Sequence, residues 1–343
     1  MEEKNYFEHK GKVIETDDHF KHVMAITLDP RTNYREGVAR CITSRTGDLT
    51  FKGAIDRSEL HKISGNSLEH FKIGEKLNIK NEAKIISELT GKDDFLGLED
   101  PDIWIDAKTN LRHLYFTIPI RPFDEKKKTK IHLGHAVGKD LDNLEMTEPV
   151  LLDTYDRSAK EVSVAPLNKQ GFRFNLIESR DRRAETRYSV VQVAIAEDMG
   201  EPWKYGDIVF HPAEQNFSWI AGHASPGPLF SKDFIDVGKG KLLGVINGCQ
   251  ADQKIGDKIK YGNFSIGFFI YDYENGCVDW VSENPLIKDS EAGKGGNRAI
   301  TFASQFVETK PGEGILYAHV DDSFVRAYTL NADKIKSLLP KSD

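Results

Sequence analysis

The chain has 343 residues, of which 39% are hydrophobic and 29% charged, and its net charge is −7. That hydrophobic fraction is typical of a globular protein, and an acidic surface repels the phosphates of nucleic acid, so no nucleic-acid partner is expected. No apolar run reaches the roughly 18 residues that a membrane span needs. The three cysteines match no zinc or CxxC spacing, and residues 1–6 show no signal-peptide pattern, so we expect a cytoplasmic protein.

Most of the sequence consists of short apolar segments between polar turns. These segments are rich in Ile, Val, Phe and Tyr and are bounded by Gly, Asp, Asn or Lys, which is typical of β-strands. The expected strands include residues 113–118, 171–177, 242–246, 265–271 and 314–319. Helical patterns are confined to residues 81–89 and 332–339. Strands and helices do not alternate, which argues against a Rossmann fold or a TIM barrel.

A weak repeat runs along the chain. A polar loop, an apolar strand, a turn and a second apolar strand recur from starting points near residues 22, 98, 160, 221 and 298. The spacing of about 60 to 75 residues leaves room for four strands, which is one propeller blade. No Pro/Gly/Ser-rich linker divides the units. The sequence therefore predicts an all-β, five-bladed β-propeller in a single domain spanning residues 1–343, with a β-sandwich carrying long loops as the alternative.

Two candidate carboxylates stand at equivalent places in successive units. Asp100 precedes Pro101, which favours an extended conformation at the residue before it and can fix a carboxylate at a strand entrance. Glu161 occupies the same place in the next unit. Glycoside hydrolysis needs two such groups, one protonated to donate to the leaving oxygen and one to activate water or attack carbon. The plainer interpretations are an acidic turn at Asp100 and an exposed glutamate at a strand start.

Other side chains at blade entrances are candidates for substrate binding. Arg180 could orient a carboxylate or bind an anion, and Trp219 could stack on a sugar face. His223 and Asp321 could hydrogen-bond sugar hydroxyls. The structural alternatives are a core tryptophan, a core histidine and an acidic turn.

Nothing in the sequence indicates a metal or an organic cofactor. His19 and His22, like His132 and His135, are three residues apart, so on a strand they point to opposite faces. No Walker A, GxSxG or HExxH motif is present. We therefore expect no cofactor and no metal.

The residues around Asp100 also carry a resemblance. Glu99-Asp100-Pro101 before an apolar strand resembles the EDPR signature of glycoside hydrolase family 130, the β-mannoside phosphorylases and β-mannosidases, which are five-bladed propellers. Residues 219–228 with the following 240–248 strand, residues 261–287 and residues 316–327 resemble further stretches of that family in the same order. The agreement extends from about residue 95 to residue 330, and the first 90 residues match poorly.

The resemblance implies roles for four residues. Asp100 falls on the family's proton donor, and Arg180 falls on an arginine that helps bind phosphate in the phosphorylases. His223 lies near the segment that carries another phosphate contact, and Asp321 falls on a sugar-binding aspartate. The related propeller families 43 and 117 place carboxylates at analogous positions.

The departures from the family pattern point away from phosphate. Asp102 replaces the arginine of EDPR, Glu161-Val162 replaces a basic residue and an asparagine, and Asn247 replaces a histidine. A phosphate dianion beside Glu161 would be repelled at close range in a dry pocket. The sequence therefore favours hydrolysis over phosphorolysis.

The sequence thus predicts an inverting, exo-acting glycosidase acting on an oligosaccharide or glycoside. Asp100 is the expected acid and Glu161 the expected base, with their carboxyl groups about 6.5–9.5 Å apart to admit a water. The expected sugar-binding residues are Asp102, Arg180, Trp219, His223 and Asp321. The alternatives are a phosphorylase with an altered phosphate site, a non-catalytic carbohydrate-binding propeller and an interaction propeller without a sugar site. The sequence leaves a homo-oligomer open.

Overall fold

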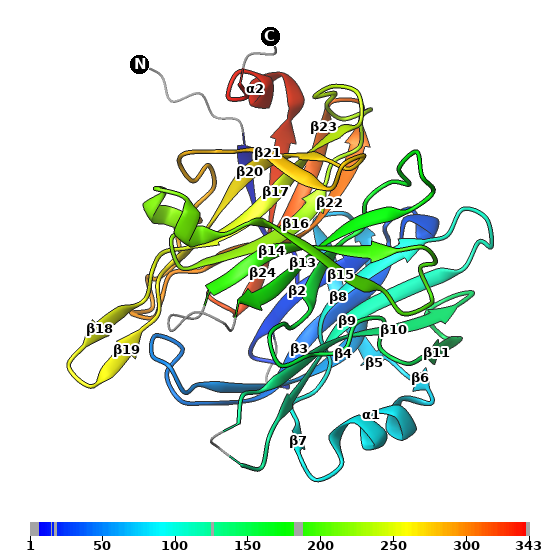
Figure 1. Cartoon of the computed structure of the whole chain (residues 1–343), viewed down its shortest axis with the longest axis vertical. Coiled ribbons are helices and arrows are strands. Elements are labelled where there is room, and N and C mark those ends of the chain that lie inside the picture. The colour runs from blue at the N-terminus through cyan, green and yellow to red at the C-terminus, as the bar shows by residue number, and fades with distance from the viewer. Residues whose placement is uncertain (1–6, 15, 17–18, 125–126, 182–187, 341–343) are drawn as a thin grey trace.

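Five four-stranded antiparallel blades make up the protein, in a computed structural model that describes residues 7–14, 16, 19–124, 127–181 and 188–340 (Figure 1). Blade 1 contains β2 (Val23–Leu28), β3 (Glu36–Thr46), β4 (Ile55–Ser67) and β5 (His70–Lys76). Blade 2 contains β8 (Glu99–Ile105), β9 (Arg112–Arg121), β10 (Lys130–Gly138) and β11 (Leu144–Met146), with β6 (Ile79–Lys80) and β7 (Asp94–Phe95) at its margins. Blade 3 contains β12 (Lys160–Ser163), β13 (Arg173–Asp181), β14 (Tyr188–Ala196) and β15 (Lys204–Phe210).

The last two blades use strands that are not all consecutive. Blade 4 contains β16 (His223–Leu229), β17 (Lys241–Cys249), β20 (Phe264–Asp272) and β21 (Cys277–Val281). Between β17 and β20 the chain forms a hairpin of β18 (Gln253–Ile255) and β19 (Lys258–Lys260). Blade 5 contains β22 (Thr301–Lys310), β23 (Glu313–Val320), β24 (Phe324–Asn331) and β1 (Phe7–Lys12).

The N-terminal strand closes the ring. β1 pairs antiparallel with β24, and Phe7 lies opposite Leu330. This pairing brings the two ends of the described chain together in blade 5 (Figure 1). A sheet that repeats radially has only short edges left to protect, and this pairing covers the outer edge of the last blade.

The repeat read from the sequence is confirmed. The innermost strands begin at Val23, Glu99, Lys160, His223 and Thr301, each within three residues of a predicted starting point. The predicted helices also form, as α1 (Glu82–Thr90) and α2 (Ala332–Lys336), although α2 is shorter than expected. Neither helix has the length and apolarity for a membrane crossing.

Apolar side chains gather between neighbouring blades rather than at the centre. One buried cluster joins blades 1 and 2 through Val38, Leu60 and Leu114, and another joins blades 1 and 5 through Ile26 and Tyr317. Similar clusters lie between blades 2 and 3, 3 and 4, and 4 and 5. Because the blade interfaces supply the core, the innermost strands are free to present polar residues to the central axis.

Candidate active site

A polar cavity of about 740 Å³ opens where the innermost strands begin. Its volume lies within the roughly 300–1,000 Å³ of small-molecule sites. Every blade contributes to its lining, including Arg40 from blade 1, Asp100 from blade 2, Glu161 from blade 3, His223 from blade 4 and His319 from blade 5. We call this cavity the basin.

A smaller cavity of about 190 Å³ continues along the innermost strands. Its lining includes Trp104, Val164, Leu229 and Phe306, which are late residues of those strands. Asp100 and Glu161 line both this cavity and the basin, so the two residues lie where the cavities adjoin.

Local backbone distortion aims both carboxyl groups at the axis. Asp100 and Glu161 have positive φ angles of 49° and 51°, which are uncommon for residues other than glycine. The extended conformation expected at Asp100 from Pro101 is therefore wrong, because the bulge imposes a positive φ there. Each stands at a bulge, where the pairing of β8 with β9 or of β12 with β13 shifts register. Blade 1 has the same combination of a bulge and a positive φ at Ala25, where φ is 28°. Bulges re-aim side chains, and strain of this kind clusters at functional sites.

Arg40 neutralises the acidic residues of blade 2. Its guanidinium contacts Glu99 Oε1 at 2.5 Å and Asp100 Oδ1 at 2.8 Å. All three side chains are largely buried, with Asp100 only 6% exposed. Burial opposes ionisation, but the charges of Arg40 and Lys160 outweigh it and lower the pKa of Asp100. Burial raises the pKa of Glu99 to about 7 despite Arg40.

Glu161 behaves in the opposite way to Asp100. Burial and the adjacent charge of Asp100 raise the pKa of Glu161 well above its ordinary value. A hydrogen bond joins the two carboxyl groups, with the Glu161 hydroxyl donating to the Asp100 carboxylate. Two carboxyl groups in contact share one proton because both cannot be ionised at such a short distance.

This contact corrects the geometry expected from the sequence. An acid and a base separated by about 6.5–9.5 Å would leave space for a water. In the structure Asp100 and Glu161 are hydrogen-bonded instead, and the raised pKa of Glu161 with the lowered pKa of Asp100 favours the protonated form of Glu161. We therefore treat the two carboxyl groups as one unit that carries a proton.

A second buried charge network lies beside the pair. The Glu178 carboxylate, 1% exposed, is 3.3 Å from Lys160 Nζ and 2.8 Å from His223 Nε2. Although burial opposes it, contact with His223 and the charge of Lys160 lower the pKa of Glu178. Glu178, His223 and Arg180 all line the basin. We call Arg40, Glu99, Asp100, Lys160, Glu161 and Glu178 the charged floor.

The acidic turn of blade 5 presents Asp322 rather than Asp321. Asp321 accepts backbone hydrogen bonds from Gly293 and Ile300, so it shapes the loop and does not line the basin. Asp322 lines the basin, and its Oδ1 lies 3.0 Å from His319 Nδ1. Burial raises its pKa, but His319 outweighs burial and lowers the pKa of Asp322 to about 2.

Two residues that were expected to bind the sugar in the basin, Trp219 and Asp102, do not line it. Trp219 is 4% exposed in the core between blades 3 and 4, packed against Gly248 and Gly267, so the expected stacking on a sugar is not available to it. Asp102 lines the smaller cavity rather than the basin, and burial raises its pKa to about 7.

The sequence pattern missed the partners that hold the carboxyl pair. Arg40 lies in the region of poor family resemblance, and its contact with Asp100 joins residues 60 positions apart. Glu178 and Asp322 stand one or two residues from the predicted Arg180 and Asp321. The sequence shows that acidic residues occur at these strand ends and turns, but it does not show which of them point into the basin.

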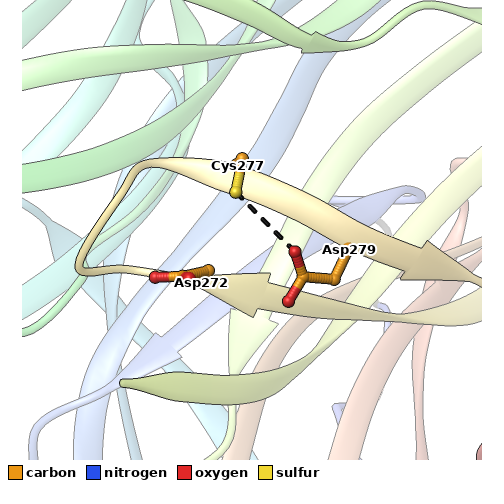
Figure 2. A group of neighbouring side chains, drawn as sticks. All are labelled: Asp272, Cys277 and Asp279. Atoms are coloured by element: carbon orange, nitrogen blue, oxygen red, sulfur yellow. Dashed lines mark hydrogen bonds between the residues drawn. The ribbon is translucent and has the colours of Figure 1, made fainter. Parts of the chain in front are cut away.

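Among the described residues, one group of three side chains has donor atoms close enough to share a metal ion: Asp272, Cys277 and Asp279 (Figure 2). The group lies at the turn between β20 and β21. Asp272 accepts backbone hydrogen bonds from Glu274 and Asn275, and Asp279 lies 2.6 Å from Lys241 Nζ. These partners assign the carboxylates to the turn rather than to a metal centre.

No protein-family model and no curated sequence matches the chain. Solved structures do share its fold. A β-1,2-mannobiose phosphorylase from Listeria innocua has a TM-score of 0.60 and 12% identity over 98% of this chain and 93% of its own. A mannose phosphorylase from Leishmania mexicana gives 0.58 and 13% over 98% and 91%. An endo-arabinase from Bacteroides thetaiotaomicron VPI-5482 gives 0.54 and 14% over 97% and 99%. The likeness confirms the propeller fold expected from the family 130 and family 43 resemblance.

Proposed function

We propose that the protein is a carbohydrate-active enzyme that hydrolyses a terminal glycosidic bond with inversion. The observation that carries this proposal is the hydrogen-bonded Asp100–Glu161 carboxyl pair, which lines the polar basin and has the pKa of Glu161 raised and that of Asp100 lowered. The pair lines both the basin of about 740 Å³ and the smaller cavity of about 190 Å³. The smaller cavity has room for little more than one sugar ring, which suits a terminal sugar. The fold supports the proposal, since the similar structures include enzymes that cleave or form bonds between sugars.

In this proposal the pair is the general acid. Glu161 carries the proton in the free enzyme and passes it to the glycosidic oxygen as the bond from that oxygen to the anomeric carbon breaks. Asp100 stays ionised beside Arg40 and favours the positive charge that develops on the sugar ring.

The base lies across the basin. In a ring of five blades, blade 5 faces the boundary between blades 2 and 3, so His319 and Asp322 lie opposite the carboxyl pair. Asp322 holds His319 through Nδ1, and the ring packs against Phe302 at 5.1 Å between centroids. His319 Nε2 then takes the proton from a water whose oxygen attacks the anomeric carbon, which is the arrangement of a base oriented by a carboxylate.

A phosphorylase is the second candidate. Phosphate is itself a nucleophile and needs no base, and Lys160 and Arg180 line the blade 3 side of the basin. A mannose phosphorylase of the same fold has been solved with a phosphate ion. Glu161 argues against this candidate only while it is ionised, and the proton it carries removes much of that repulsion.

The test is turnover of aryl glycosides, short β-mannosides and arabinosides, each with and without phosphate. Wild type is compared with Asp100→Asn, Glu161→Gln and His319→Ala, and with Asp233→Asn as a matched control at an exposed aspartate outside the basin. Hydrolysis without phosphate that is lost in the first three variants and kept in the control supports the proposal. Turnover that requires phosphate and survives His319→Ala would replace it with the phosphorylase.

A further inference from the structure

Three cations of the basin differ from those of the charged floor. Lys52, Lys254 and Arg298 line the basin, yet no carboxylate of the described residues lies within ion-pair distance of any of them. Arg40 and Lys160, in contrast, contact carboxylates at 2.5–3.3 Å. We call Lys52, Lys254 and Arg298 the cationic wall.

The cationic wall is a built structure and not a chance meeting of surface lysines. The Lys52 amide donates to the Ile259 carbonyl at 3.0 Å, and Phe51 forms a β-bridge with Lys260. The Arg298 amide donates to Thr50 Oγ1 at 3.2 Å. These bonds join the β3–β4 loop, the β18–β19 hairpin and the start of blade 5 into one side of the basin.

The hairpin points Lys254 into the basin. Lys254 and Ile259 are directly opposed in the β18–β19 pair, so their side chains project from the same face. Both line the basin, and the Ile259 carbonyl is the group that holds Lys52. The two lysines are therefore tied to one point of the wall.

Arg298 is held in place by aromatic rings and by groups other than the described carboxylates. Its guanidinium lies over the rings of Tyr261 and Phe264, at 5.1 and 4.6 Å from their centroids. Nε donates to the Gly262 carbonyl, and Nη2 lies 3.2 Å from Cys249 Sγ. No described residue accepts a hydrogen bond from Nη1. An arginine held by aromatic faces and backbone is pre-organised to receive an oxyanion, because little side-chain freedom is lost on binding.

The charge balance favours an anion at this wall. Two acidic residues of the basin lie near the three cations, Asp252 and Asp322. Asp252 Oδ1 already accepts from the Gly262 amide, and Asp322 Oδ1 lies 3.0 Å from His319 Nδ1, while the charge of Arg298 helps to lower the pKa of Asp322. The wall thus keeps an excess of positive charge in a protein whose net charge is −7. Cations that line one side of a cleft focus its field and attract the opposite charge.

We propose that the cationic wall binds an anionic substituent of the saccharide substrate: a carboxylate, a sulfate or a phosphate ester on the sugar. The inference rests on the proposed function for the identity of the molecule as a saccharide. The substituent lies on the blade 4–5–1 side of the basin, away from the acid pair of blades 2 and 3. Arg298 acts on the neighbouring Asp322 only through its charge, so the wall selects the substrate and none of its side chains donates or accepts the proton in bond cleavage.

Direct binding tests the proposal without any turnover. Glucuronate, glucose 6-sulfate and glucose 6-phosphate are titrated calorimetrically into wild-type protein beside neutral glucose and inorganic phosphate, at low and at high ionic strength. We expect at least one charged sugar to bind about tenfold or more tightly than glucose, because hydrogen bonds to a charged group contribute more to the binding free energy than hydrogen bonds between neutral groups. The advantage should shrink as salt screens the exposed lysines.

Variants locate the effect. Arg298→Gln and the double variant Lys52→Gln/Lys254→Gln should each lose most of the preference for the charged sugar, while Lys239→Gln, at an exposed lysine outside the basin, keeps it. Equal binding of charged and neutral sugars, or no binding of any charged sugar, would overturn the proposal. Inorganic phosphate binding as tightly as glucose 6-phosphate would also overturn it, because the anion would then be a free one.

The outcome is separable from that of the proposed function. Hydrolysis of neutral glycosides with no preference for charged sugars leaves the proposed function standing and removes the wall's role. Tight binding of a charged sugar that depends on Arg298, without turnover of any glycoside, supports the wall and removes the hydrolase.

Discussion

The charged floor and the cationic wall differ in how their charged side chains are stabilised. On the floor, cations and carboxylates are buried and neutralise one another, as Arg40 does with Asp100 and Lys160 with Glu178. On the wall, Lys52 and Lys254 are exposed and Arg298 is half-buried, and no carboxylate of the described residues lies within ion-pair distance of any of the three. A buried charge is stable only when an opposite charge compensates its loss of hydration, whereas a cation in contact with water needs no protein partner and can bind a ligand. The floor is therefore suited to hold a proton and the wall to recognise a charge.

The largest expected effect lies on the floor. Glu161→Gln removes the proton that the pair carries, and a lost general acid typically costs about 10²–10⁴ in rate. Because the pKa of Glu161 is raised well above its ordinary value, wild-type activity should persist through neutral pH and fall as pH rises through that pKa. The pH–rate profile of the variant should lack this basic limb. An unchanged profile would separate Glu161 from the acid role.

The stability of the two regions should differ sharply when an arginine is removed. Arg40→Met leaves Glu99 and Asp100 buried without the cation that contacts them, with only the charge of Lys160 nearby, and breaking such a pair costs about 3–5 kcal/mol. Arg298→Met leaves Asp322 beside His319 and Arg45 and should cost about 1 kcal/mol, mostly from the contacts of Arg298 with two aromatic rings. Urea unfolding of both variants at pH 7 measures the difference. Equal losses would show that the floor and the wall are not distinct.

Asp102, just beyond the floor, should make stability depend on pH. Its folded-state pKa of about 7 exceeds the ordinary value of 3.8, so between these values the folded protein binds more protons than the unfolded chain. The free energy of unfolding should therefore fall by about 1–3 kcal/mol as pH rises from 4 to 8. Asp102→Asn should remove that part of the slope in chemical denaturation followed against pH. A slope that is identical in the variant would contradict the raised pKa.

The smallest effect on stability belongs to the lysines of the wall. Lys52→Gln and Lys254→Gln should each change the free energy of unfolding by less than about 0.5 kcal/mol, because exposed side chains without partners contribute little. Thermal unfolding of these variants beside Lys239→Gln provides the check. A large loss would mean that the lysines hold the β18–β19 hairpin in place, and the wall would then be a structural feature.

The blades could be read from the sequence because each one repeats a local pattern. The strand starts near residues 98 and 160 follow from alternating polar loops and apolar runs. The same reading predicted that Asp100 and Glu161 face one pocket, and both residues line the same two cavities. The interactions that decide their chemistry are not local. Arg40 reaches Asp100 from another blade, and the bulges that bring the two carboxyl groups into contact leave no mark in residue type.

The remaining wrong predictions concern which of two neighbouring side chains points into the basin. Asp321 and Asp322 are adjacent and alike, and only the turn geometry decides that Asp322 lines the basin. Trp219 lies four residues before His223, but a 3-10 turn directs its ring into the core while His223 begins a strand at the basin. Composition cannot distinguish a stacking tryptophan from a packing one.

The protonation state of the Asp100–Glu161 pair tests the account most directly. Carbon-13 carboxyl NMR of glutamate-labelled protein, titrated with pH and assigned with Glu161→Gln, reports that state without any knowledge of the substrate. The account predicts one glutamate resonance that remains protonated through neutral pH and disappears in the variant. A Glu161 carboxyl that is ionised at pH 7 and titrates near its ordinary pKa would contradict the shared proton and, with it, the proposed acid.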